Sequence, residues 1–247
     1  MAYRVPRHSK EARRQTLVAR SIGLVLLWGL VCVMAFIADR TLPIQTLPWK
    51  PLALIDPVGL ATRTKATLAG ADPVACRAVL RQGGLAFDPV PESRSGDFCA
   101  HHDAIKLTSG MARLNPEGPP MTCKQALALT IWERQIVQPA AFDLMGQAVV
   151  RIDHFGSYSC RRMYGKAAGP VSQHATANAL DVARFHLADG QVISVARDWK
   201  DKGPKGQFLH RIRDGACRVF VVTLSPDYNS AHADHLHLDM GTWPVCG

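Results

Sequence analysis

The 247-residue chain is long enough for one large domain with an appendage or for two small domains. A composition of 47% hydrophobic and 20% charged residues excludes a mainly disordered, fibrous or multi-pass membrane protein. The net charge of +9 would favour a nucleic-acid partner if it were spread over the folded part. Residues 1–40 hold seven Lys/Arg and two Asp/Glu, however, so more than half of the excess sits in a short N-terminal segment.

This N-terminal segment predicts a membrane anchor. The basic tail 1–20 precedes an uncharged run of apolar residues, 21–38, which would span roughly 27 Å as a helix. Residues 35–38 lack a clean small-x-small cleavage site, which favours an uncleaved signal anchor over a cleaved signal peptide. The run has no polar face, which argues against a buried core helix. The positive-inside rule then keeps residues 1–20 in the cytoplasm and sends the rest across the membrane, so nucleic acid is nearly excluded as a partner.

Beyond the anchor, the pattern predicts a spacer followed by an α+β domain. Residues 39–73 are rich in proline and have no sustained periodicity, so we expect a spacer there and a folded domain over 74–247. Apolar periodicity predicts helices over 74–81 and 123–138. Runs of branched and aromatic residues predict strands over 148–152, 178–185, 191–195, 218–224 and 236–240. A helical first half and a strand-rich second half indicate an α+β fold.

Cysteine usage agrees with export. Six cysteines follow the anchor, with no C-x-x-C pair, at Cys76, Cys99, Cys123, Cys160, Cys217 and Cys246. An even, widely spaced set is typical of disulfides in an oxidising compartment rather than of a zinc ribbon, and buried reduced thiols are the alternative. The simplest pairing joins neighbours in sequence: 76 with 99, 123 with 160, and 217 with 246.

The histidines are distributed unevenly, and seven of the ten fall between residues 154 and 237. His235 and His237 are two apart in a predicted strand, so they project from one face while Leu236 and Leu238 enter the core. The segment 172–181 adds His174 and Asp181 among small residues. Two imidazoles and a carboxylate are a typical ligand set of catalytic zinc. The alternative is a set of unrelated surface and core histidines.

Two motifs together resemble a known superfamily. Ser172-x-His174-x6-Asp181 with His235-x-His237 resembles the paired motif of the LAS metallopeptidases, which include lysostaphin, D-alanyl-D-alanine carboxypeptidases and the sonic hedgehog signalling domain. SQHATANALDVARF, SPDYNSAHADHLHLDMG and the six cysteines are more closely similar to the bacterial extensin-like C-terminal domain family, over residues 60–247.

The resemblance implies a small antiparallel sheet flanked by helices, with Zn²⁺ held by His174, Asp181 and His237. It also implies that the substrates are peptide bonds of bacterial cell walls. One departure is the middle of the first motif, where related peptidases commonly have glycine and this chain has Thr176 and Ala177.

The remaining roles are assigned by proximity in sequence and by the same resemblance. No glutamate lies near the motifs, so His235 is the candidate general base, and His232 is expected to assist or orient it. Asp239 or Asp234 is expected to fix an imidazole tautomer, and Ser172 to support the first motif. Arg161 resembles the arginine that follows the first core strand in D-alanyl-D-alanine peptidases. It would hold a substrate carboxylate or an oxyanion, unless it simply pairs with an acid.

These features predict a zinc peptidase anchored in the bacterial inner membrane, with its domain in the periplasm and peptidoglycan stem peptides as substrates. The second hypothesis is a zinc-bearing binding module that docks on the wall or on a partner protein. Trp132, Trp199 and Trp243 are interpreted as packing aromatics rather than sugar platforms.

Overall fold

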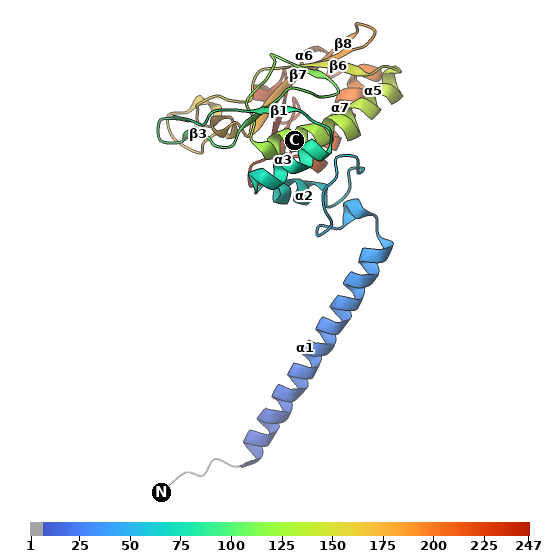
Figure 1. The fold of residues 1–247 in the computed structure, drawn as a ribbon, viewed down its shortest axis with the longest axis vertical. Coiled ribbons are helices and arrows are strands. Elements are labelled where there is room, and N and C mark those ends of the chain that lie inside the picture. Colours follow the sequence, from blue (N-terminus) through green and yellow to red (C-terminus); the bar gives the residue numbers. More distant parts are fainter. Residues whose placement is uncertain (1–6) are drawn as a thin grey trace.

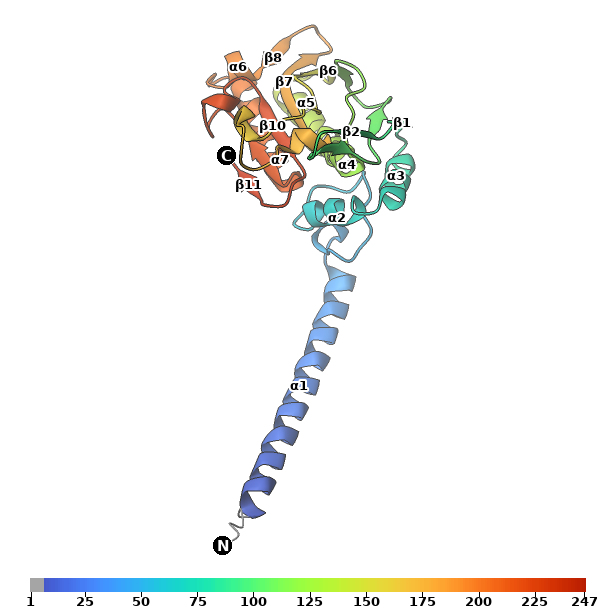
Figure 2. The same cartoon turned by 90° about the vertical axis from the view of Figure 1, so that its left-hand side faces the viewer.

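A computed structural model describes residues 7–247, so the first six residues of the predicted cytoplasmic tail lie outside the described part. Helix α1 (Arg7–Thr41) contains the predicted apolar run. Within its segment Ala12–Thr41, an 18-residue window has a mean hydropathy of 2.5 and no buried share, so the helix is long and apolar enough to cross a membrane. Figures 1 and 2 show α1 as a rod that stands away from the rest of the chain. An apolar helix that packs against nothing in its own chain needs another apolar environment.

A seven-stranded sheet forms the centre of the domain. Its order is β11-β9-β10-β7-β6-β5, with β8 paired to β7. The central pairs are antiparallel, and the two outer pairs, β5 with β6 and β11 with β9, are parallel. The strands are β5 (Arg113–Asn115), β6 (Val149–His154), β7 (Ala179–Leu187), β8 (Val192–Ser194), β9 (Val222–Leu224), β10 (Leu236–Asp239) and β11 (Val245–Cys246). The α+β prediction is confirmed.

Helices bury one face of this sheet. They are α4 (Cys123–Trp132), α5 (Gln138–Met145), α6 (Val195–Asp198) and α7 (Pro204–Val219), and α3 (Pro73–Gln82) packs on α4. Trp132 of α4 is fully buried, packs edge to face on Phe185 and Phe220, and donates from its indole nitrogen to the carbonyl of Ile212. Each buried aromatic side chain of this size removes a large apolar area from water, so this contact stabilises the sheet-to-helix interface strongly.

Two predicted elements differ from the structure by more than two residues at one end. The helix predicted over 123–138 begins at Cys123, where the Thr122 hydroxyl caps it, and it continues through a π-helical turn (Glu133–Val137) into α5. The strand predicted over 218–224 is wrong in its first part, because α7 continues to Val219 and β9 begins only at Val222. An amphipathic helix that buries Phe208 and Ile212 overrides the local β-propensity of its last turn.

Residues 39–73, predicted as a spacer, contribute to the domain. They contain a short 3₁₀ turn (Ile44–Thr46) and helix α2 (Thr62–Ala69). Leu54 and Ala66 belong to the buried core, and α2 packs against α3, α4 and α7. The Lys65 ammonium group donates to the carbonyl of Ile44. A proline-rich composition therefore did not predict a separate linker here, because the turns fold back onto the helical layer.

Four short strands form two small sheets in an arm at one side of the domain, where β3 is labelled in Figure 1. The pairs are β1 (Phe87–Pro89) with β4 (Ile105–Leu107) and β2 (Ser93–Ser95) with β3 (Cys99–His101). Because these strands have three residues each, they rely on the covalent and tertiary contacts around them.

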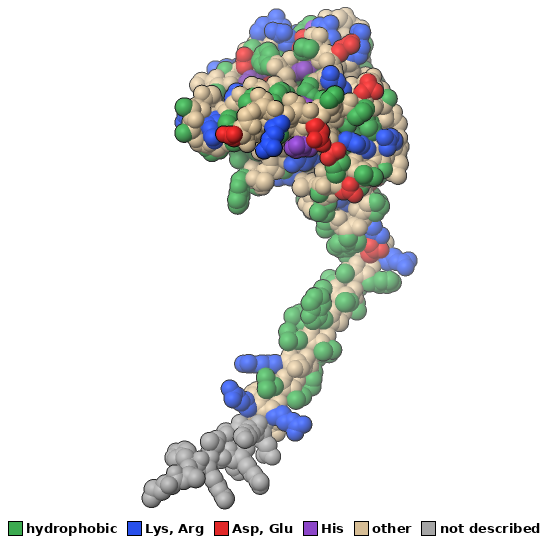
Figure 3. Space-filling model, turned by 60° about the vertical axis from the view of Figure 1, so that its left-hand side comes forward, with side chains coloured by type: hydrophobic (Ala, Val, Ile, Leu, Met, Phe, Trp, Pro, Cys, Tyr) green, Lys and Arg blue, Asp and Glu red, His purple; other side chains and the backbone are tan. Residues whose placement is uncertain are grey.

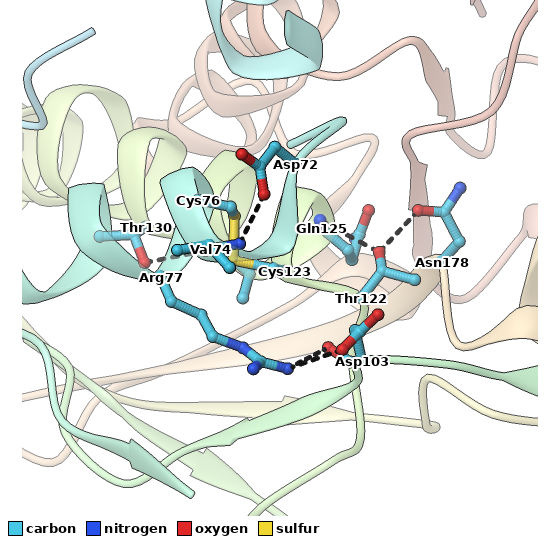
Figure 4. The surroundings of a disulfide bond; sticks show 11 residues. Asp72, Val74, Cys76, Arg77, Asp103, Thr122, Cys123, Gln125, Thr130 and Asn178 are labelled. Carbon is cyan, nitrogen blue, oxygen red and sulfur yellow. Dashed lines mark hydrogen bonds and ion pairs between the residues drawn. A yellow bond between two sulfur atoms is a disulfide. The ribbon is translucent and has the colours of Figure 1, made fainter. Parts of the chain in front are cut away.

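Three disulfides link the elements, and two differ from the predicted pairing. Cys76 pairs with Cys123, tying α3 to the start of α4, and Cys99 pairs with Cys160, tying β3 to the loop after β6. The predicted pair of Cys217 with Cys246 is confirmed. Figure 4 shows the first bond beside the two helix caps at Asp72 and Thr122. Neighbours in sequence were the wrong partners because α3 packs on α4, which places Cys76 beside Cys123 and not beside Cys99.

Candidate metal centre

Three side chains from distant parts of the chain meet on the sheet face opposite the helices. Asp181 lies on β7, His237 lies directly opposite it on β10, and His174 comes from a 3₁₀ turn, η4 (Gln173–Thr176), just before β7. The Asp181 Oδ1 atom is 2.8 Å from His237 Nδ1 and 3.1 Å from His174 Nε2, and these two nitrogens are 3.2 Å apart. The three predicted ligands therefore converge on one point.

A β-bulge sets the direction of Asp181. Strict alternation along β7 would place Asp181 on the same face as Phe185, which is buried in the core. Between the pairs Asp153–Arg184 and His154–Val182, however, the register shifts by the extra residue Ala183. Bulges of this kind redirect side chains near sites. As a result Val182 and Phe185 both enter the core while Asp181 points away from it.

The η4 turn places His174. The Ser172 hydroxyl accepts a hydrogen bond from the backbone N–H of His174, so this predicted supporting residue acts through the backbone. The turn ends at Ala177, which has φ 55° and ψ 30°, a left-handed conformation that favours glycine. The chain thus keeps the backbone shape of a glycine turn with an alanine.

The other nitrogen of each ligand imidazole is held by an acceptor. His174 Nδ1 lies 3.3 Å from the carbonyl oxygen of Ser157, and His237 Nε2 lies 3.0 Å from the Asp239 carboxylate. Because these acceptors can only receive a proton, they fix the tautomers that turn His174 Nε2 and His237 Nδ1 toward Asp181. Two lone pairs and one carboxylate oxygen then face each other, which requires a positive charge between them.

The residues fit a small divalent metal. Zinc binds nitrogen and oxygen ligands at about 2.0–2.1 Å in a tetrahedron, which places neighbouring ligand atoms about 3.3 Å apart. The three separations of 2.8 to 3.2 Å are within about half an ångström of that value. His174, Asp181 and His237 are accordingly a group whose ligand atoms all lie within 4.8 Å of one another.

The protonation equilibria of the site reflect the same electrostatics. Burial favours the neutral imidazole of His237, but hydrogen bonds and charge from Asp181 and Asp239 outweigh burial and raise its pKa to about 9. Burial also opposes ionisation of Asp181, yet the imidazoles of His174 and His237 hold the pKa of its carboxyl well below its usual range. The site thus keeps one cation, a proton or a metal ion, in the middle of the cluster.

Two further histidines lie beside the ligands. His235 turns Nε2 toward the site, 3.6 Å from Asp181 Oδ1, while Nδ1 lies 2.8 Å from the Asp234 carboxylate. The His232 ring centroid is 5.3 Å from that of His235, and its Nδ1 donates to the amide oxygen of Asn229. Burial and the nearby imidazoles lower the pKa of His232 to about 4, so it is neutral at pH 7. Of the two acids predicted to fix an imidazole tautomer, Asp234 therefore fixes that of His235, and Asp239 fixes that of His237.

A pocket of about 440 Å³ opens onto this cluster. Arg161 lines it, as the only Lys or Arg among the described residues that do so. The wall also contains three aromatic residues, Tyr164, Tyr228 and Trp243. The Trp243 side chain is 82% exposed, so the interpretation of this tryptophan as a packing residue was wrong, whereas Trp132 and Trp199 are buried as expected. The pocket therefore brings together the Arg161 guanidinium, exposed aromatic rings and the cluster of candidate metal ligands.

The part of the chain that carries this site matches a family model. Residues 74–247 match the family described as extensin-like protein C-terminus. The chain belongs to this family. The sheet that carries Asp181 and His237 and all six disulfide cysteines lie within the extensin-like region, whereas α1 and α2 precede it. Comparison with curated proteins and with solved structures gave no match.

Sequence reasoning missed several parts of the extensin-like site. The Ser157 carbonyl that orients His174 and the Asn229 amide that orients His232 are contacts of the folded loops, which carry no residue pattern. The aromatic wall was missed as well. Trp243 follows the HxH strand by only a few residues, and this closeness was the one available signal.

Proposed function

We propose that the protein is a membrane-anchored, zinc-dependent peptidase that hydrolyses amide bonds in peptidoglycan stem peptides. The observation that carries the proposal is the convergence of His174, Asp181 and His237 at the bottom of an open pocket, with neutral His232 and inward-turned His235 beside them. Helix α1 would hold the protein in the bacterial inner membrane, with the basic tail in the cytoplasm and the domain in the periplasm.

The bound ion would supply a Lewis acid that polarises a scissile carbonyl and makes water a better nucleophile near neutral pH. The chain supplies proton transfer. His235 Nε2 faces the ligand cluster while the Asp234 carboxylate receives the proton on Nδ1, so Nε2 is free to accept a proton from the attacking water. Asp234 also stabilises the imidazolium that forms, since it is an anion 2.8 Å away.

His232 supports this step from the other side of the pocket. With its Nδ1 proton donated to Asn229, its Nε2 carries a lone pair. Its low pKa keeps it uncharged, so it does not repel a protonated His235 or the cationic metal centre. We assign His232 the role of a neutral acceptor that orients water and the His235 ring.

The pocket wall supplies substrate binding. The Arg161 guanidinium would bind a carboxylate of the stem peptide bidentately, and stem peptides carry such groups at their ends. The exposed Trp243 and Tyr228 rings would pack against apolar parts of the same substrate. This arrangement fits a peptide with a carboxylate close to its scissile amide.

The proposal is tested by digesting purified peptidoglycan with the full chain in detergent, with and without a chelator, and identifying products by mass spectrometry. Asp181→Ala and His237→Ala should lose stoichiometric zinc, because each removes a ligand. His235→Ala should keep zinc and lose turnover by about 100-fold or more, as expected for a general base. His102→Ala, an exposed histidine on the arm, is the matched control with unchanged activity.

Normal turnover in all three site variants would refute the peptidase. Stoichiometric zinc and wall binding without cleavage of any muropeptide would instead support the zinc-bearing binding module.

A further inference from the structure

Large apolar side chains are exposed at the base of the domain, where α1 ends. We name Leu42, Ile44, Trp49 and Leu60 the base patch; their exposed fractions are 50%, 39%, 56% and 89%. Scattered exposed apolar residues are ordinary, but four at one junction are not. Figure 3 shows apolar side chains that continue from α1 onto the base of the domain.

Hydrogen bonds hold the base patch against the end of α1. The Trp49 indole nitrogen donates to the Asp39 carboxylate at 2.9 Å, and the Lys50 ammonium is 2.7 Å from the same carboxylate. The backbone N–H of Ala61 donates to the carbonyl of Gln45, which brings Leu60 beside the turn that contains Ile44. The patch is therefore built into the fold and is not a set of loose linker residues.

The position of the patch identifies its occupant as lipid. The uncharged run of α1 ends at Ala38, and Leu42 follows one helical turn later, a rise of about 6 Å. This distance is the depth of the headgroup layer beside a hydrocarbon core of about 30 Å. Trp49 with Arg40 and Lys50 nearby is the side-chain combination found at membrane interfaces, where rings lie at headgroup depth and cations contact phosphates.

We propose that the base patch inserts into the interfacial layer of the same bilayer that α1 crosses, so that the domain is docked on the membrane surface instead of being suspended above it. This inference rests on the anchoring part of the proposed function and is independent of the peptidase chemistry. It also gives residues 42–60 a role that a flexible spacer would not have.

The test uses nitroxide labels on the full chain in nanodiscs of phosphatidylethanolamine and phosphatidylglycerol, at one copy per disc, in a Cys32→Ser background. Leu60→Cys reports on the base patch. Phe142→Cys on α5, 68% exposed and also apolar, is the matched control outside the patch, and Leu27→Cys reports on the span itself. Thermal unfolding verifies that each variant is folded.

We expect the label at position 60 to be several-fold less accessible than the label at 142 to a water-soluble nickel complex, and more accessible to oxygen. Equal accessibility at 60 and 142, with protection at 27, would overturn docking while the anchor stands. Loss of protection at 27 would overturn the anchor and docking together. Protection at 60 that appears only with several copies per disc would assign the patch to a second copy of the chain and overturn the lipid assignment.

Discussion

At the scale of single residues, the metal affinity of the candidate centre depends on the positions of three protons on its side chains. Ser157 and Asp239 take the outward N–H groups of His174 and His237, and Asp181 faces their remaining nitrogens. The cluster therefore holds a proton tightly when no metal is bound. Metal binding must displace that proton, which couples affinity to pH.

We predict that zinc affinity rises with pH between about 6.5 and 9. Below pH 9 His237 is protonated, so each unit of increasing pH should raise the apparent affinity about tenfold, until the proton is lost. Competition with a chromophoric chelator at several pH values measures this. Asp239→Asn should shift the rise to lower pH, since it removes one of the two carboxylates that raise the pKa of His237. A pH-independent affinity would contradict the assignment of His237 as a ligand.

The raised pKa of His237 also determines how the stability of the metal-free protein, in the presence of a chelator, depends on pH. The pKa of His237 is raised from 6.5 to about 9 in the folded protein, so its contribution is complete below pH 6.5 and is lost as the pH rises through 9. The lowered pKa of Asp181 acts in the opposite window, because its contribution is lost as the pH falls below the ordinary aspartate range.

A second residue-scale prediction concerns Ala177. Its left-handed conformation costs an L-residue about 1–2 kcal/mol, which glycine does not pay. Ala177→Gly should therefore be less destabilising than Ala126→Gly, a substitution of an equally buried alanine in α4, by about 1–2 kcal/mol. Urea denaturation of both variants measures the difference. Equal losses of unfolding free energy would show that the turn is not strained.

At the scale of elements, the C-terminal strand depends on its covalent bond. Strand β11 has two residues and pairs only with β9, and the disulfide of Cys217 with Cys246 joins it to α7. Trp243 lies in the connection between β10 and β11, so the same bond supports one wall of the pocket. Short edge strands have few contacts of their own, and this link compensates for that weakness.

We predict that replacing Cys217 and Cys246 together with serine lowers the free energy of unfolding by about 3–4 kcal/mol, the loop-closure value for a separation of 29 residues. Zinc affinity should stay within a few-fold, because none of the three ligands lies on β11. Substrate KM should rise, since Trp243 loses its fixed position. Denaturation curves, zinc titration and kinetics separate these effects. A large loss of zinc would show that β11 supports the ligands directly.

At the scale of the whole molecule, the structure and the family match place the start of the domain at different residues. The family match begins at residue 74, but Leu54, Ala61 and Ala66 are buried before it. The segment 42–73 covers the helical layer on the side that faces α1, and α2 appears there in Figures 1 and 2. The folded unit therefore starts soon after α1.

We predict that a chain of residues 74–247 is less stable than one of residues 42–247 by about 3 kcal/mol or more, the cost of losing a buried leucine and its neighbours. Chemical denaturation of the two truncated chains provides the measurement. Leu54→Ala in the longer chain should reproduce much of the loss, whereas Ile55→Ala, at a neighbouring position that is 78% exposed, should not. Equal stability of the two truncated chains would instead support the interpretation of residues 42–73 as a spacer.

The sequence alone determined the features that local pattern encodes. An uncharged 18-residue run predicted a helix long and apolar enough to span a membrane, and α1 is such a helix. The period-two spacing of His235 and His237 placed both beside one sheet face. His174 and Asp181 were found because their spacing resembles a known motif. The number of cysteines predicted disulfides, but their partners depend on which elements pack together, and two of the three pairs came out differently.

Tertiary structure alone decided the rest, because it depends on contacts between residues far apart in sequence. The bulge at Ala183 turns Asp181 out of the core, and no residue pattern records a register shift. The carbonyl of Ser157 reaches His174 only after the loops fold. Trp243 forms a pocket wall rather than part of the core because β11 holds it at the sheet edge. The candidate ligands were thus recognisable from local sequence, whereas their alignment, protonation and access to solvent are properties of the fold.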